Sequence, residues 1–140
     1  MQNNKPTHER LSQFLTECES LGLVRLIVTN GGAVLEAQTT LQKLFYADLP
    51  KGHYANMHGD PFEFHLNMDM IAQIKFELGT AKRGNFNTYA IRLLSKEPDT
   101  NVLSIFLQWT KPGEYAPGQI EAWEALKLKY GESWSIDTHG

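Results

Sequence analysis

The sequence predicts an α+β fold, in which a strongly curved and mostly antiparallel β-sheet of about seven to nine strands has a helix at each end of the chain. Two observations support this class. Apolar residues recur at helical spacing only near the two ends, whereas alternating segments joined by short connections fill the middle. Short connections exclude parallel βαβ units, and helices at the ends of such a chain cover one side of the sheet. We expect one domain over residues 1–140, with a leading helix in 1–21, the sheet in 22–111 and a terminal helix in 117–131.

The leading helix is predicted from an N-cap and an apolar stripe. Thr7 is the expected N-cap, and Gly22 is the expected stop. The apolar residues that share one face of this helix are Leu11, Phe14, Leu15 and Cys18.

A hairpin follows, because alternating residues on both sides of Asn30-Gly31-Gly32 flank a strong tight-turn signal. Residues 39–46 fit either a turn of helix or an irregular strand, and Leu49-Pro50-Lys51-Gly52 interrupts the pattern. The remaining alternating segments are 54–57, 61–66, 71–78, 85–94 and 102–109. Ile120, Trp123, Leu126 and Tyr130 then recur at helical spacing, and the tail after Glu132 is expected to fray.

Composition excludes several functions. A formal charge of −3 gives no broad basic field, so nucleic acid is not an expected partner. The chain has a polar start and no apolar run of membrane-helix length, so we expect a cytoplasmic protein without membrane insertion. The single Cys18 forms no internal disulfide and is expected to be a partly buried helical cysteine, with a reactive thiol as the alternative. The phosphate-binding, nucleophile-elbow and zinc-protease motifs are absent from the sequence.

The densest polar cluster is the best candidate site. Its members are His53, Tyr54, His58, Asp60, Glu63 and His65. Imidazole and phenolate groups bind transition metals and haem iron. The alternative is structural: His53 and His58 would be exposed loop histidines, and His65 would be a satisfied histidine on the sheet face opposite Phe64 and Leu66.

Aromatic and basic residues allow two interpretations as well. Phe62, Phe64, Phe76, Phe86, Phe106 and Trp109 either fill the core or line a broad apolar cleft suited to a flat ligand. Arg25, Lys75 and Arg92 lie inside expected strands and could reach the rim of such a cleft, whereas the Lys82-Arg83 pair lies in a turn where charges are usually solvated.

Five phrases resemble, in order and spacing, one repeat of the intracellular haem-utilisation proteins of the HemS, ChuX and HutX type. The resemblance covers about 100 of the 140 residues. The phrases are Phe62-Glu63-Phe64-His65-Leu66, Met70-Ile71-Ala72, Ser104-Ile105-Phe106-Leu107, Lys111-Pro112-Gly113-Glu114 and Ile120-Glu121-Ala122-Trp123-Glu124-Ala125-Leu126, and Tyr54-Ala55-Asn56-Met57 resembles the family's aromatic-x-Asn-apolar phrase.

The resemblance implies a haem-binding protein. HemS proteins hold two repeats, whereas ChuX and HutX relatives have one and pair as dimers, so a homodimer is expected. The HutX-type tyrosine corresponds to Tyr54, with His58 as the alternative axial ligand. His65 belongs to the same candidate site, His8 corresponds to a ligating histidine of the two-repeat proteins, and Arg25 and Arg92 would hold the propionates.

Some family charges are replaced in this sequence. Asn67, Leu78-Gly79 and Trp109-Thr110 stand where relatives carry basic residues, and Thr29 stands where ChuX has a histidine. Three functions therefore stay open: a haem carrier that exchanges haem with a donor or acceptor protein, a haem-degrading enzyme that uses an external reductant, and a module that kept the fold without haem.

Overall fold

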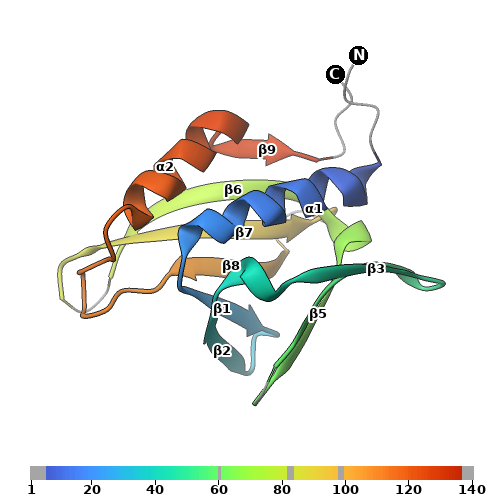
Figure 1. The fold of residues 1–140 in the computed structure, drawn as a ribbon, viewed down its shortest axis with the longest axis horizontal. Coiled ribbons are helices and arrows are strands. Elements are labelled where there is room, and N and C mark those ends of the chain that lie inside the picture. The colour runs from blue at the N-terminus through green and yellow to red at the C-terminus, as the bar shows by residue number, and fades with distance from the viewer. Residues whose placement is uncertain (1–5, 60, 82–83, 98–99, 137–140) are drawn as a thin grey trace.

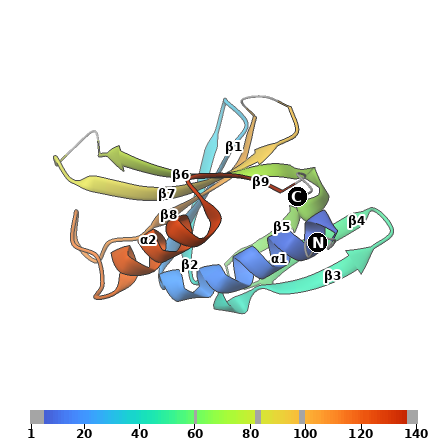
Figure 2. The same ribbon diagram turned by 90° about the horizontal axis from the view of Figure 1, so that it is seen from above.

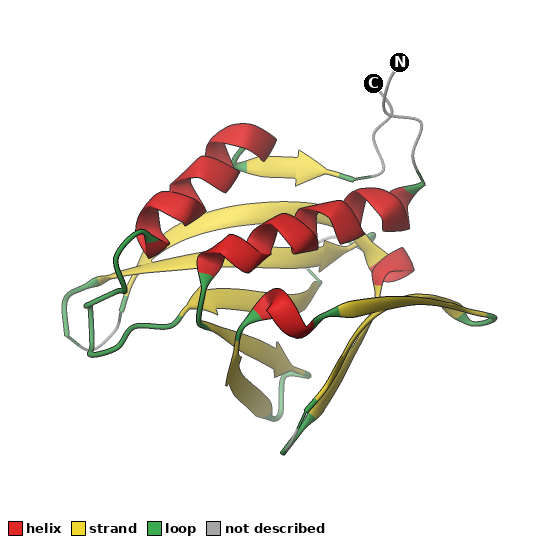
Figure 3. Cartoon of the chain, in the orientation of Figure 1, coloured by secondary structure: helices red, strands yellow, loops and turns green. Residues whose placement is uncertain are grey.

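The computed structural model describes residues 6–59, 61–81, 84–97 and 100–136, and shows two α-helices, three short 3-10 helices and nine strands (Figures 1 and 3). Asp60, Lys82 and Arg83 lie outside the described residues. The elements are α1 (Thr7–Glu17), η1 (Cys18–Leu21), β1 (Val24–Thr29), β2 (Val34–Thr39), η2 (Leu41–Lys43), β3 (Phe45–Leu49), β4 (Gly52–His58), β5 (Glu63–Asn67), η3 (Met68–Met70), β6 (Ile71–Thr80), β7 (Asn87–Ser95), β8 (Asn101–Leu107), α2 (Gln119–Tyr130) and β9 (Ser133–Ser135).

The strands form two antiparallel sheets. One has six strands in the order β2-β1-β8-β7-β6-β9, and the other has three strands in the order β3-β4-β5. Every pairing between the described strands is antiparallel, which confirms the predicted α+β class and the exclusion of βαβ units. The chain leaves the large sheet after the first hairpin and returns to it at β6, so the small sheet forms a separate wall.

Both helices cover one face of the six-stranded sheet, and α1 also faces the three-stranded sheet (Figures 1 and 2). Phe14 of α1 and Trp123 of α2 each pack edge-on against the Phe76 ring of β6, at centroid distances of 6.1 and 5.7 Å. On its other side, α1 places Thr16 within 3.4 Å of the Tyr46 hydroxyl on β3. The core therefore lies between the six-stranded sheet and the three-stranded sheet, and α1 packs between them. Neither described helix is long and apolar enough to cross a membrane.

The first hairpin forms where the sequence predicts it. The Asn30 side-chain oxygen accepts hydrogen bonds from the backbone N–H groups of Gly32 and Ala33, at 2.9 and 3.0 Å. Gly31 has φ of 94°, a left-handed conformation that glycine adopts without steric cost. The asparagine-glycine signal is thus satisfied by an Asx turn.

Two predicted boundaries are wrong. The N-cap of α1 is Pro6 rather than Thr7, because the fixed φ of proline suits this position and its carbonyl accepts from the N–H groups of Glu9 and Arg10 at 3.0 and 3.1 Å. The tail does not fray directly after Glu132: β9 pairs with β6, and Ile136 is fully buried. Burial of the Ile136 side chain holds β9 in place, although this strand is too short to be recognised from its hydrophobic pattern.

The ambiguous segment 39–46 resolves into η2 followed by the start of β3. Cys18 is fully buried, more deeply than the partly buried position predicted, and it lies in η1 at the end of the leading helix. Burial, reinforced by the nearby Glu17 carboxylate, raises the pKa of the Cys18 thiol, so the group stays protonated and unreactive at neutral pH.

Candidate functional site

The outer face of the three-stranded sheet brings together three of the predicted ligand residues. Alternation along β4 turns Tyr54 and His58 outward, whereas Ala55 and Met57 are buried against the core. His65 of β5 pairs with Asn56 of β4 and faces the same way. Together they line a shallow hollow of about 320 Å³, whose walls are Phe45, Ala47, Leu49, Lys51, Tyr54, Asn56, His58 and His65.

The His65 ring is held in one orientation. Its Nδ1 lies 2.8 Å from the Asn56 side-chain oxygen, and its Nε2 lies 3.3 Å from a Glu63 carboxylate oxygen. The Asn56 amide nitrogen points at the Tyr54 carbonyl, 3.5 Å away, so the amide oxygen accepts from His65 Nδ1. Because both partners are acceptors, both contacts call for a ring N–H, and a metal bound at Nε2 would have to replace the contact with Glu63.

Aromatic groups surround these donors. The His58 ring meets the rings of Phe45 and His65 edge-to-face, at centroid distances of 5.0 and 5.7 Å. Lys51 places its ammonium group 5.5 Å from the Tyr54 ring. Phe45 and Leu49 are each 43% exposed, so the hollow combines uncovered apolar surface, nitrogen and oxygen donors and one cation. Such a surface suits a flat, partly apolar and anionic ligand.

His8 does not join this hollow. Its ring stacks on His53 at a centroid distance of 3.6 Å with 4° between the planes, and His53 precedes Tyr54 on β4 and so faces the helix side of the sheet. The prediction of His53 and His58 as loop histidines is wrong as well, because β4 includes both. His53 Nδ1 lies 3.0 Å from both carboxylate oxygens of Asp69.

Arg25 and Arg92 lie inside strands, as predicted, but on the six-stranded sheet. Two guanidinium nitrogens of Arg92 donate to one carboxylate oxygen of Glu77, at 2.8 Å from Nε and 2.7 Å from a terminal nitrogen, and Arg92 also donates to the Ser104 hydroxyl. Arg25 lies 3.6 Å from Glu36. Both guanidinium groups lie over the Phe106 ring, at 5.8 Å for Arg25 and 5.1 Å for Arg92. Their charges are therefore already compensated, and the structure does not bring them to the Tyr54 hollow.

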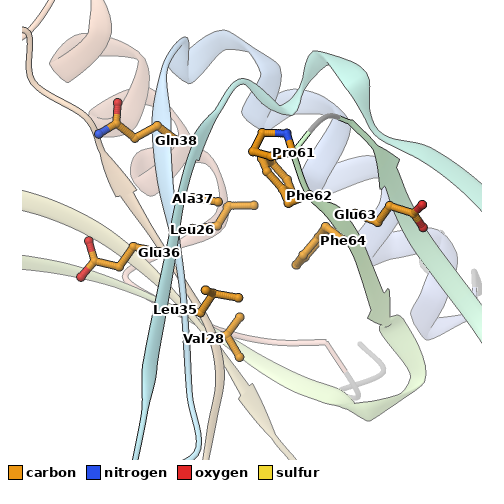
Figure 4. Close-up of a pocket in the computed structure, with 10 residues that line it drawn as sticks. All are labelled: Leu26, Val28, Leu35, Glu36, Ala37, Gln38, Pro61, Phe62, Glu63 and Phe64. Atoms are coloured by element: carbon orange, nitrogen blue, oxygen red, sulfur yellow. The ribbon is translucent and has the colours of Figure 1, made fainter.

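A larger apolar cleft, of about 450 Å³, lies between the first hairpin and β5 (Figure 4). Side chains of Leu26, Val28, Leu35, Phe62 and Phe64 point into it, while Glu36 and Glu63 point away. Its lining residues are Leu26, Val28, Leu35, Glu36, Ala37, Gln38, Pro61, Phe62, Glu63 and Phe64. Histidine, tyrosine, lysine and arginine are absent from this lining, so the cleft offers an apolar surface without an imidazole or phenol group for haem iron.

Sequence reasoning missed several residues that line the hollow, of which Lys51 and Phe45 matter most for a ligand. The sequence pattern marks Lys51 only as part of a turn, and Phe45 lies in residues 39–46, which fit either a helical turn or an irregular strand. Pairing of β3 with β4 identifies Phe45, because it is then opposite Asn56, and places Lys51 in the turn between the two strands.

Comparison with known proteins defines the family. The sequence model of the ChuX/HutX haem-utilisation family matches residues 6–126, and the chain therefore belongs to that family. No curated protein matches the chain.

Solved structures share the fold at low identity. A protein from Agrobacterium tumefaciens has a TM-score of 0.70 and 23% identity, covering 87% of this chain and 67% of its own. The haem-binding protein ChuX has a TM-score of 0.69 and 20% identity, covering 87% of this chain and 73% of its own. The haem-binding protein PhuS from Pseudomonas aeruginosa, in its holo form, has a TM-score of 0.64 and 15% identity over 84% of this chain, which corresponds to only 32% of PhuS.

Proposed function

We propose that this protein binds haem against the outer face of the three-stranded sheet and carries it in the cytoplasm for haem uptake and iron utilisation. The observation that supports this most is the hollow in which Tyr54, His58 and His65 surround the exposed ring of Phe45, in a member of a haem-utilisation family. The relatives ChuX and PhuS are described as haem-binding proteins. A porphyrin laid on this face would bury the exposed apolar rings and meet an axial donor at the same time.

Tyr54 is the preferred axial ligand, and the strand geometry ranks the two histidines behind it. His58 lies four residues along the same strand, about 13 Å from Tyr54, which is too far for both to reach one iron. His65 is diagonal to Tyr54 across the strand pair, at about 7–8 Å. Replacement of the Tyr54 phenol should therefore pass ligation to His65 before His58.

The cation of this face is Lys51, and it is the proposed partner of a haem propionate. Arg25 and Arg92, predicted for that role, are held by Glu36 and Glu77 on the other sheet. A single lysine offers one point charge, so propionate binding would add modestly to affinity and would weaken with salt.

A homodimer remains part of the proposal. β2 is an edge of the six-stranded sheet, and it exposes 62% of Val34 and 73% of Leu35. An open edge with exposed apolar residues is stabilised by pairing with a second copy. We expect a two-fold interface of roughly 1,200 Å² or more in total.

The test is a hemin titration of the parent, Tyr54→Phe and Tyr46→Phe. Tyr46 is a matched control, because it lies on the neighbouring strand but faces α1 through Thr16. The parent and Tyr46→Phe should give the same Soret band, whereas Tyr54→Phe should shift the ferric spectrum toward a nitrogen-ligated form.

The double variant Tyr54→Phe, His65→Ala should bind hemin at least tenfold more weakly than the parent, which corresponds to about 1.4 kcal/mol. A parent without a specific Soret band would leave the non-haem module as the better hypothesis. If every variant gives the same spectrum as the parent, neither Tyr54 nor His65 is a ligand of the haem iron.

Addition of ascorbate to the haem complex distinguishes a carrier from a degrading enzyme. With a carrier, the Soret band shifts on reduction but keeps its intensity. With a degrading enzyme, the Soret band disappears. The fold also occurs in ChuS from Escherichia coli O157:H7, which is described as a haem-degrading enzyme. A haem donor or acceptor protein stays a prediction, to be tested by haem transfer from or to candidate partners.

A further inference from the structure

We propose that His8, His53 and Asp69 form a binding site for a divalent transition metal of the Zn²⁺ type, separate from the haem face. One donor atom from each of the three residues lies within 4.8 Å of the other two. The site joins the first turn of α1, the start of β4 and the centre of η3. It lies on the helix side of the small sheet, because His53 and Tyr54 are successive residues of a strand and face opposite ways.

The carboxylate of the site is held in place by the backbone around it. Asp69 Oδ2 accepts the His53 backbone N–H at 3.1 Å, and the Asp69 N–H donates to the Asn67 side-chain oxygen at 3.1 Å. Gly52 makes room for this arrangement, since a Cβ at that position would lie 3.0 Å from Asn67 and 3.2 Å from Asp69 side-chain atoms. The carboxylate is therefore oriented before any ion arrives, which lowers the cost of binding.

The electrostatics favour a cation. Asp69 contributes a carboxylate, an ordinary acid that is ionised at neutral pH, so the site offers a negative charge to an ion. A second carboxylate, Asp48, lies 4.0 Å from the other ring nitrogen of His53. Two acidic groups thus flank one imidazole.

The donor set selects the kind of ion. Two imidazole nitrogens and one carboxylate suit Zn²⁺ and similar transition metals, whereas Mg²⁺ and Ca²⁺ prefer oxygen ligands. Donors on a tetrahedral zinc lie about 3.4 Å apart, since zinc–ligand distances are roughly 2.1 Å. Closing the site from a spread of up to 4.8 Å needs movements of about 1 Å, together with a pivot of the stacked His8 ring.

A second trio, His58, Glu63 and His65, has donors equally close, but all three residues are exposed and belong to the haem face. It provides the control. A variant with His58→Ala and His65→Ala removes that trio and leaves the proposed site intact.

The experiment is a titration of the chelator-treated full chain with Zn²⁺ by calorimetry and with Co²⁺ by visible absorption. The parent and the His58→Ala, His65→Ala variant should bind one ion, and Co²⁺ should give the intense visible band of a site with low coordination number. His8→Ala and Asp69→Asn should each weaken binding at least tenfold. Circular dichroism without metal establishes that each variant is folded.

A melting curve gives an independent readout, because an ion that ties α1 to β4 and η3 stabilises the folded state only. Saturating Zn²⁺ should raise the Tm of the parent and leave that of His8→Ala unchanged. The proposal is overturned if the parent binds no Zn²⁺, if His8→Ala binds as tightly as the parent, or if removal of His58 and His65 abolishes binding. Haem binding does not enter either readout, so this outcome is independent of the proposed function.

Discussion

Replacement of Trp123 by alanine tests how α2 is docked on the six-stranded sheet. Trp123 is 2% exposed, and its rings pack edge-on against Phe76 and Tyr89 at centroid distances of 5.7 and 5.2 Å. Its indole N–H donates to the Ala90 carbonyl at 3.2 Å. A large aromatic side chain buries about 150–250 Å², which at about 25 cal/mol per Å² is worth about 4–6 kcal/mol, and substitutions of this kind cost about 3–5 kcal/mol.

For a domain of this size, about 1 kcal/mol shifts Tm by roughly 4 °C. Trp123→Ala should therefore lower Tm by about 12–20 °C, measured by calorimetry or circular dichroism. Leu128→Ala is the matched control, because Leu128 lies on the same helix and is 88% exposed. It should change the free energy of unfolding by less than about 0.5 kcal/mol. A Trp123→Ala variant that melts within about 2 °C of the parent would refute the docking of α2 described above.

Two further predictions concern the helix pair and the dimer. The Lys129 ammonium lies 2.8 Å from Glu17 and, against the opposing effect of burial, holds the Glu17 pKa below its usual 4.5. A lowered folded pKa gives stability that is present above pH 4.5 and is lost as pH falls through the folded value. Lys129→Met should thus lower the stability by about 0.5 kcal/mol at pH 7 and match the parent in acid, and an equal loss at both pH values would contradict the assignment. Leu35→Asp on the open β2 edge should reduce the mass measured by light scattering from twice 15.9 kDa to 15.9 kDa. Leu128→Asp should leave the dimer intact, and a parent that is monomeric at high concentration would exclude the dimer.

Local patterns in the sequence determined the type of most elements. Period-two alternation predicts β6 because Ile74 and Phe76 are buried while Lys75 between them is exposed. The turn at Asn30 was equally local, since an asparagine side chain caps its own turn. The same alternation correctly placed His65 on the face opposite Phe64 and Leu66.

Local signals failed where a distant contact supplies the stability. β9 has three residues and no recognisable period, and it is ordered because it pairs with β6 and because Ile136 beside it is buried. The prediction of Thr7 as the N-cap starts α1 one residue late, because threonine is a common N-cap whereas Pro6 occupies that position in the structure.

The candidate site shows the same division. Alternation could predict that Tyr54 and His58 share a face, because they lie on one strand. Alternation could not predict that His8 stacks on His53 and so lies away from Tyr54. Nor could it predict that Arg25 and Arg92 lie on the other sheet, where they pair with Glu36 and Glu77. A residue's face depends on its immediate neighbours, which the sequence displays. The contacts between faces depend on pairing between strands that are distant in sequence, such as β1 with β8. That pairing is decided by the apolar area buried and the hydrogen bonds formed in the folded chain.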